Sequence, residues 1–438
     1  MNMPQIVMAS EATPSVSRTF ARLLRFARND IFFKSFIAAL LIVPSQAADA
    51  PVVTVASSPF HTGIDELKKS DFAFLQGKQV GLITNHTGVD AQGESTADLL
   101  AHAPGVKLIA LFSPEHGIRG QKEAGALVGD MVDLRTHLPV YSLYGVTQKP
   151  TPVMLNGVDV LVFDLQDAGT RFYTYISTMG LAMEAAAQRG IGFVVLDRPN
   201  PLGGAIVEGH VLDPWVRHFT AYFSIPVRHG LTVGELARWY NETAHLHLDL
   251  TVVPMTGWTR DMAWSDTGRP FIGPSPNIRT LTQALLYSGV GAFEATNVSV
   301  GRGTETPFEW IGAPWIHGAE LAQRLNALAL PGIEAEAAQF VPQTDVYAGQ
   351  LCSGVRFKVT DSKALRTTDL FIQTAFLLRD LYGRDFQPRW EEMVRVTGTR
   401  DFEEAYKTGK TAERLLGSVH ASAAHFADER KPYLLYGS

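Results

Sequence analysis

Residues 158–204 constrain the fold more than any other stretch of this sequence. They contain two short apolar runs rich in β-branched residues, 158–163 and 193–196. Residues 173–189, between these runs, have the spacing of a helix, and Gly190 follows as a stop signal. A strand, a helix and a strand at this length predict a βαβ unit with two parallel strands. Because both strands are apolar almost throughout, we expect helices on both faces of the sheet.

Polar residues follow four predicted strands, at the point where each strand ends. Two of these strands precede the βαβ unit, at residues 79–84 and 107–113. Ligands of open parallel sheets bind at the carboxyl ends of the strands, so we expect one polar cleft along this edge. The residues expected there are Asn85 and His86, Glu115 and His116, Asp164, Asp167 and Arg171, and Asp197, Arg198 and Asn200.

The chain has 438 residues, which is enough for two or three domains. We predict an α/β domain with a parallel sheet over residues 48–288 and a second domain over residues 289–438. A long loop at 254–280 carries Asn277, and long ordered loops are usually functional. The second domain opens with a polar stretch that contains Glu294, Asn297 and Arg302.

The first 47 residues have the order of a secretory signal peptide. Five basic residues precede an apolar run at 36–43, and small residues occupy the −3 and −1 positions of a cut after Ala47. The apolar run is too short for a bilayer, which needs about 20 residues. We therefore expect a periplasmic or secreted protein with no stable membrane insertion after cleavage. The alternatives are an uncleaved membrane anchor and a disordered tail.

Composition and missing motifs exclude several classes. A net charge of −6 gives no electrostatic case for nucleic acid binding. The single cysteine, Cys352, excludes an internal disulfide and is expected to be a buried, inert thiol. The sequence has no G-x-S-x-G or H-E-x-x-H motif, and Glu404 replaces the first glycine of a phosphate loop before Gly409. Nucleotide cofactors, serine hydrolysis and zincin chemistry therefore have no sequence support.

Carboxylates are the best candidates for chemistry. Glycoside hydrolysis needs two of them, one to protonate the leaving oxygen and one to attack or to activate water. Glu115 follows Pro114 at the end of an apolar strand, where a low-dielectric wall would raise its pKa as a general acid requires. Asp167 is the first choice for the partner, and Glu208 and Glu294 compete for that role.

Other polar side chains are candidates for substrate binding. His86, His116 and His229 could join an aspartate in a metal site, but their spacing matches no compact ligand motif, and we expect no metal. Arginines bind carboxylates in a bidentate way, so an anionic ligand is plausible. The binding candidates are Asn85, His86, His116, Arg171, Tyr175, Asp197, Arg198, Asn200, His229, Asn277, Asn297 and Arg302, with Arg228 as a further cation and Tyr173, Trp258, Trp264, Trp310 and Trp315 as aromatic platforms.

Several motifs in this order resemble the NamZ/YbbC family of exo-β-N-acetylmuramidases. The matching segments are LFSPEHGIRG, VFDLQDAGTRFYTYISTM, LDRPNPLGG, PVRHGLTVGELA, PSPNIRT and TNVSVGRGTETPFEWIGAPW. They extend from about Gly81 to Trp315. The resemblance implies a Rossmann-like domain and a smaller α+β C-terminal domain, with the site in the cleft between them and no cofactor.

The resemblance also implies an activity, the release of terminal N-acetylmuramic acid from the non-reducing end of peptidoglycan-derived disaccharides or muropeptides. Glu115, in the SPEHG segment, is the first choice for the acid. The lactyl carboxylate of N-acetylmuramic acid would suit one of the arginines. Two other hypotheses stay open, a periplasmic solute-binding protein for murein sugars without turnover and a metal-dependent hydrolase.

Overall fold

The computed structural model describes residues 60–123 and 125–437. The predicted signal peptide lies outside these residues. Within them, no helix is both long and apolar enough to cross a membrane.

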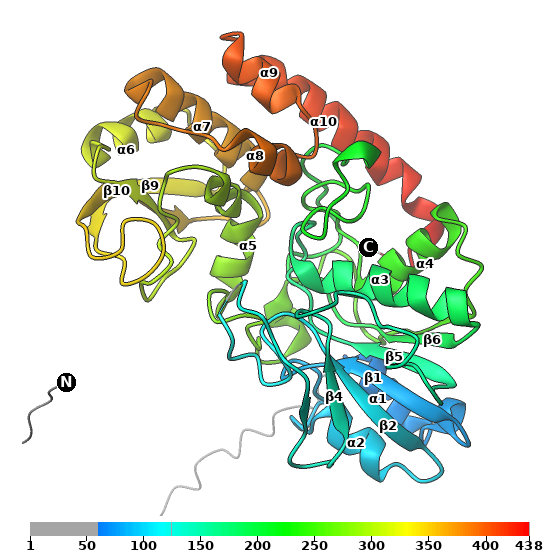
Figure 1. Ribbon diagram of the computed structural model, residues 1–438. Coiled ribbons are helices and arrows are strands. Elements are labelled where there is room, and N and C mark those ends of the chain that lie inside the picture. The colour runs from blue at the N-terminus through cyan, green and yellow to red at the C-terminus, as the bar shows by residue number, and fades with distance from the viewer. Residues whose placement is uncertain (1–59, 124, 438) are drawn as a thin grey trace, which may run out of the picture. The chain divides into compact units, whose positions relative to one another are not determined.

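A seven-stranded sheet forms the first part of the described chain (Figure 1). Its strand order is β3-β4-β2-β1-β5-β6-β7, and every neighbouring pair is parallel except β3 and β4. The predicted parallel sheet is confirmed, and β7 is a strand that the sequence analysis did not identify. The strands are β1 (Gln79–Thr84), β2 (Lys107–Ser113), β3 (Met131–Val132), β4 (Pro139–Ser142), β5 (Val160–Asp164), β6 (Gly192–Leu196) and β7 (Leu250–Val253).

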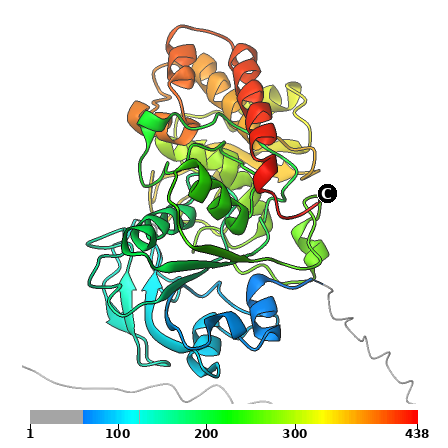
Figure 2. The same cartoon turned by 90° about the vertical axis from the view of Figure 1, so that its right-hand side faces the viewer.

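Helices cover both faces of this sheet, as the apolar strands predicted. Alternate residues of β5 enter different cores, because successive side chains of a strand point to opposite faces. Val160 and Val162 pack with α1 (Gly63–Lys69) and α2 (Thr96–His102), while Leu161 and Phe163 belong to the core that includes α3 and α4. Figures 1 and 2 both show α1 and α2 on one side of the sheet and the green helices α3 (Thr174–Arg189) and α4 (Val233–Thr243) on the other.

Local signals set the ends of these helices. Thr232 and Glu235 form the capping box that their spacing predicted, and each satisfies an otherwise unpaired N–H group at the start of α4. Gly190 ends α3 with a φ of 63°, a left-handed conformation that glycine adopts without steric cost.

A three-stranded antiparallel sheet organises the smaller, second part of the chain. Its order is β8-β10-β9, and Cys352, at the start of β10, is fully buried, which raises the pKa of its thiol to about 11. The elements are α5 (Leu281–Val290), η4 (Gly291–Ala295), β8 (Trp310–Ala313), α6 (Gly318–Ala327), β9 (Ile333–Phe340), β10 (Cys352–Val359), α7 (Thr367–Tyr382), α8 (Trp390–Thr397), α9 (Asp401–Lys407) and α10 (Ala412–Glu429).

Strand β9 extends over residues 333–340, although its composition does not favour a strand. Glutamate and alanine have low strand propensity, and pairing with β10 is what holds this segment extended. Helix α5 packs on α7.

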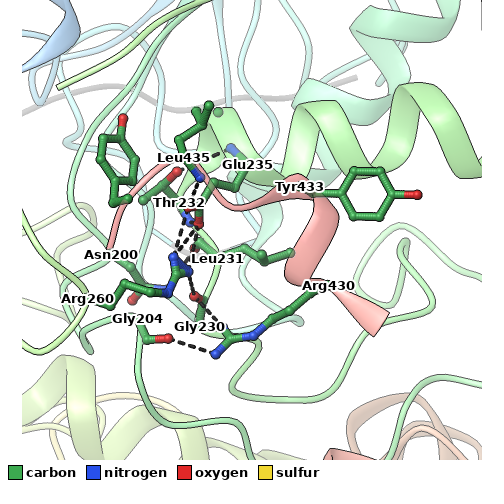
Figure 3. Close-up of polar contacts among 12 residues, drawn as sticks. Asn200, Gly204, Gly230, Leu231, Thr232, Glu235, Arg260, Arg430, Tyr433 and Leu435 are labelled. Atoms are coloured by element: carbon green, nitrogen blue, oxygen red, sulfur yellow. Dashed lines mark hydrogen bonds and ion pairs between the residues drawn. The ribbon is translucent and has the colours of Figure 1, made fainter. Parts of the chain in front are cut away.

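The C-terminal segment returns to the first sheet domain through a buried polar network (Figure 3). The Arg260 guanidinium donates to both carboxylate oxygens of Glu235, with the shortest contact at 2.8 Å. The backbone N–H of Leu435 donates to Glu235 Oε1 at 2.8 Å, and Arg430 donates to the carbonyl oxygens of Gly204 and Gly230. These contacts hold the end of the chain against α4.

Replacing Arg260 with methionine is expected to lower the free energy of unfolding by about 3–5 kcal/mol, because Glu235 would keep a buried charge without its cation. Urea unfolding followed by circular dichroism measures this change. Arg324→Met is the matched control: Arg324 is exposed on α6, and its loss should change stability by less than about 0.5 kcal/mol. Equal effects of the two substitutions would contradict the expected cost.

Candidate active site

A cavity of about 240 Å³ lies where the carboxyl ends of the parallel strands meet the second sheet domain. Loops after β2, β4 and β5 form one side of it, and α5, η4 and α8 form the other. The side chains that line it include Glu115, His116, Tyr144, Phe172, Tyr173, Thr174, Ser275, Asn277, Tyr287, Glu294, Arg302, Phe308, Glu392 and Arg395.

Glu115 projects into this cavity from the loop that follows β2, and it is only 7% exposed. Its Oε1 accepts a hydrogen bond from the Gly125 backbone N–H at 2.8 Å, and its Oε2 accepts one from the Thr174 hydroxyl at 2.5 Å. Burial, together with the adjacent Glu115 carboxylate, raises the pKa of Tyr144 to about 12, so this phenol stays protonated. Donors from two segments therefore fix the Glu115 carboxylate in one orientation.

Glu294 reaches the same cavity from the second sheet domain. It lies in η4 and forms a close ion pair with Arg302. Burial alone would lower the pKa of the Arg302 guanidinium, but the Glu294 carboxylate outweighs burial and raises it. The guanidinium also lies over the Phe308 ring, 5.4 Å from its centroid. The structure thus brings two predicted carboxylates, Glu115 and Glu294, to one cavity.

Asp167, the predicted partner of Glu115, is buried and does not line this cavity. Its Oδ2 accepts a hydrogen bond from the Gly169 backbone N–H at 2.6 Å, while Oδ1 has no hydrogen-bond partner among the described residues. Burial raises the pKa of this carboxyl to about 7. Its charge also contributes to the raised pKa values of Tyr175 and Tyr287, which places it near Tyr287 of the cavity wall.

The raised pKa of Asp167 predicts a pH dependence of stability. The folded protein holds a proton on this carboxyl up to about pH 7, whereas the ordinary value is 3.8, so the associated stability is present below about pH 4 and is lost as the pH rises through 7. An Asp167→Asn variant lacks this titration. We expect the stability difference between wild type and Asp167→Asn to shift by about 2 kcal/mol in favour of the variant between pH 5 and pH 8.

Urea unfolding of both proteins at the two pH values measures this shift. Asp385→Asn, at an exposed position, is the control and should show a pH-independent difference from wild type. A pH-independent difference for Asp167→Asn as well would show that Asp167 does not titrate in this range.

Arg171, a predicted ligand-binding arginine, serves the fold instead. It is fully buried and donates to the carbonyl oxygens of His210 and Ile225 at 2.8 and 2.9 Å. It also donates to the carbonyl oxygens of Arg395 and Val396, in the last turn of α8. A cation satisfies the unpaired carbonyl groups at a helix end, so Arg171 fixes α8 against the loop after β5.

The residues after β6 are likewise engaged away from the cavity. Asp197 accepts hydrogen bonds from the Thr232 hydroxyl and the Gly234 backbone N–H, both at 2.8 Å, and so holds the start of α4. Burial raises the pKa of Asp197 to about 7. Arg198 forms a buried bidentate pair with Asp164. The side-chain amide of Asn200 donates to the Leu231 carbonyl oxygen at 2.9 Å.

Glu208, a third candidate for the catalytic pair, lies in a buried ion pair. Its Oε1 is 2.8 Å from Arg228 Nη1, and its Oε2 accepts from the backbone N–H of Thr368 at 3.1 Å at the start of α7. Neither Glu208 nor Arg228 lines the cavity. His229 is also buried elsewhere, and burial, with the nearby charge of Arg430, lowers its pKa to about 3.

Three further predicted residues, Asn85, His86 and Tyr175, support the cavity from behind. The Asn85 side-chain amide donates to the Tyr175 hydroxyl at 2.7 Å, and this hydroxyl donates to the Pro274 carbonyl oxygen at 2.6 Å. His86 Nε2 lies 2.9 Å from the Gly273 carbonyl oxygen. These contacts hold the loop that presents Asn277 to the cavity. Asn297 bonds instead to the backbone of Asp385 and Gln387, ahead of α8.

Several cavity residues were missed by the sequence analysis. Tyr144, Thr174, Tyr287, Glu392 and Arg395 lie outside the predicted set, and of the proposed aromatic platforms only Tyr173 lines the cavity. Thr174 lies within one of the segments that resemble the NamZ/YbbC family, so the sequence did contain a signal for this residue. Glu392 and Arg395 lie on α8, which follows all of these segments in the sequence. In the described part of the chain, no group of three or more histidine, cysteine, aspartate or glutamate side chains is arranged to hold a metal ion.

The fold and site define a two-part α/β protein with a carboxylate-lined cavity at the carboxyl ends of its parallel strands. Comparison with known protein families identifies the family to which this chain belongs. Family models described as exo-beta-N-acetylmuramidase NamZ, N-terminal and C-terminal, match residues 80–282 and 285–436. The chain belongs to the NamZ family.

Individual relatives agree with this assignment. The chain is 44% identical over 393 residues to the peptidoglycan beta-N-acetylmuramidase NamZ of Bacillus subtilis, covering 90% of this chain and 95% of that one. Two crystal structures of DUF1343 family proteins from Bacteroides fragilis are similar to it in fold. One has a TM-score of 0.82 and 39% identity, the other a TM-score of 0.71 and 30% identity, and each match covers 86% of this chain and 99% of the other.

Proposed function

We propose that this chain is a glycoside hydrolase that removes terminal N-acetylmuramic acid from the non-reducing end of peptidoglycan-derived disaccharides or muropeptides. The observation that carries the proposal is the presence of Glu115 and Glu294 on one cavity, since glycoside hydrolysis uses two carboxylates on either side of the scissile bond. Membership of the NamZ family and the name of the Bacillus subtilis relative support the substrate class.

In this proposal, Glu115 is the general acid. It transfers a proton to the glycosidic oxygen while the bond from that oxygen to C1 of the muramic acid breaks, and the rest of the substrate leaves as an alcohol. Glu294 is the second carboxylate, which attacks C1 or deprotonates the water that attacks it. Water supplies the hydroxyl group at C1 and, in the same turnover, the proton that restores Glu115.

We assign the second role to Glu294 rather than Asp167 because of position. Glu294 lines the cavity and lies beside Arg302, whereas Asp167 is buried outside the lining. We also propose that the protein acts in the periplasm or outside the cell, on the basis of the signal-peptide pattern that ends near Ala47.

Turnover of an aryl β-N-acetylmuramide by the purified protein, beside the matching β-N-acetylglucosaminide, tests the function. We expect aryl release from the muramide. If neither compound is cleaved and the disaccharide binds tightly without turnover, the chain is a binding protein and the hydrolase proposal fails.

A further inference from the structure

Arg395 is the one arginine on the cavity wall without a charge partner among the described residues. Its guanidinium has no hydrogen-bond or ion-pair partner in that part of the chain, although the side chain lines the cavity and is half-buried. Arginine has five N–H donors in a planar fork, and a half-buried fork without partners fits a planar anionic ligand.

The other arginine of the cavity wall and two of its three glutamates are already paired. Arg302 Nε binds Glu294, and Asp345 Oδ2 lies 3.8 Å from the same nitrogen. Glu392, one turn before Arg395 on α8, is paired with Arg389 at 2.7 Å rather than with Arg395. Among the described residues, a carboxylate on the substrate would therefore meet one free cation in this cavity, the Arg395 guanidinium.

Arg395 also has a fixed position relative to Glu115. The buried Arg171 binds the backbone carbonyl oxygens of Arg395 and Val396, at 3.5 and 2.6 Å, and is itself held by the loops around His210 and Ile225. This contact joins the end of α8 to the loop that leads into α3, and α3 begins at Thr174, which bonds to Glu115. The position of the Arg395 backbone relative to the general acid is thus set by rigid elements.

We propose that Arg395 determines specificity by binding the lactyl carboxylate of N-acetylmuramic acid in a bidentate way. The inference rests on the proposed function and adds to it the residue that distinguishes this sugar from N-acetylglucosamine, which has a hydroxyl group in place of the lactyl ether. It replaces the four arginines selected from the sequence, because Arg171, Arg198 and Arg228 do not line the cavity and Arg302 is paired.

The test compares kcat/KM of wild type and Arg395→Gln on aryl β-N-acetylmuramide, on its lactyl methyl ester and on aryl β-N-acetylglucosaminide. We expect Arg395→Gln to lower kcat/KM on the muramide by about 100-fold, mainly through KM, and to leave the two uncharged substrates within about threefold of wild type. Arg395→Lys keeps the charge but lacks the planar guanidinium group. It should recover part of the loss in kcat/KM on the muramide.

Arg384→Gln is the matched control, because this substitution removes the same charge. Arg384 is exposed, and its side chain has no partner among the described residues. The control substitution should leave all three values unchanged. If wild type cleaves the muramide and Arg395→Gln does so equally well, or if the variant loses activity equally on all three substrates, the inference is overturned while the proposed function stands. If wild type cleaves none of the three, the proposed function itself fails.

Discussion

Glu115→Gln is expected to lower kcat on a natural disaccharide by about 10³- to 10⁴-fold, because the leaving sugar alcohol needs a proton from this residue. An aryl glycoside with an acidic phenol as leaving group needs little protonation. On that substrate we expect the same variant to lose less than about 50-fold in kcat. Steady-state kinetics on the two substrates measures this contrast, which a general acid produces and a purely structural residue does not.

The fold should survive this substitution, because glutamine keeps the size of the side chain and one of its oxygen acceptors for Gly125 and Thr174. Glu336→Gln is the control, since Glu336 is exposed on β9 and does not line the cavity. It should leave both substrates unaffected. Equal losses on the disaccharide and the aryl glycoside would remove Glu115 from the role of acid.

Glu294→Gln is expected to lower kcat on the disaccharide and on the aryl glycoside alike, by about 10²- to 10⁴-fold. The second carboxylate acts at C1, so its loss lowers kcat whatever the leaving group is. The different pattern from Glu115→Gln separates the two roles. Glutamine can still accept a hydrogen bond from Arg302, so loss of the ion pair should not displace η4.

Two comparisons make this prediction specific. Glu305→Gln changes an exposed glutamate in the same segment and should have no effect on turnover. Asp167→Asn should reduce kcat by less than about tenfold, in keeping with a buried residue behind the wall. If Asp167→Asn abolishes turnover while Glu294→Gln retains it, the two carboxylates exchange roles and the sequence-based choice is restored.

The sequence by itself determined the architecture of the first sheet domain. Apolar β-branched runs predicted β1, β2, β5 and β6, and the capping box of Thr232 and Glu235 predicted the start of α4. These signals are local, because strand patterning and helix caps depend on residues within a few positions of each other. The family resemblance and the selection of Glu115 as a cavity residue also came from short segments of the chain.

Tertiary structure decided which polar residues face the cavity. Asp197, Arg198 and Glu208 follow strands or lie near site motifs, as Glu115 does, yet each is bound to a neighbouring element. The sequence does not say whether a charged side chain at a strand end meets a ligand, a helix start or another charge, because those partners are 34 or more positions away for Asp197 and Arg198.

The second side of the cavity depended entirely on packing. Arg395 is 280 positions from Glu115 in the sequence, and α8 reaches the cavity because Arg171 binds its last carbonyl groups. Nothing within the segment around α8 distinguishes it from an ordinary amphipathic surface helix. The elements and the family were therefore readable from local sequence, whereas the choice between a buried structural charge and a free one at the site required the long-range contacts that folding creates.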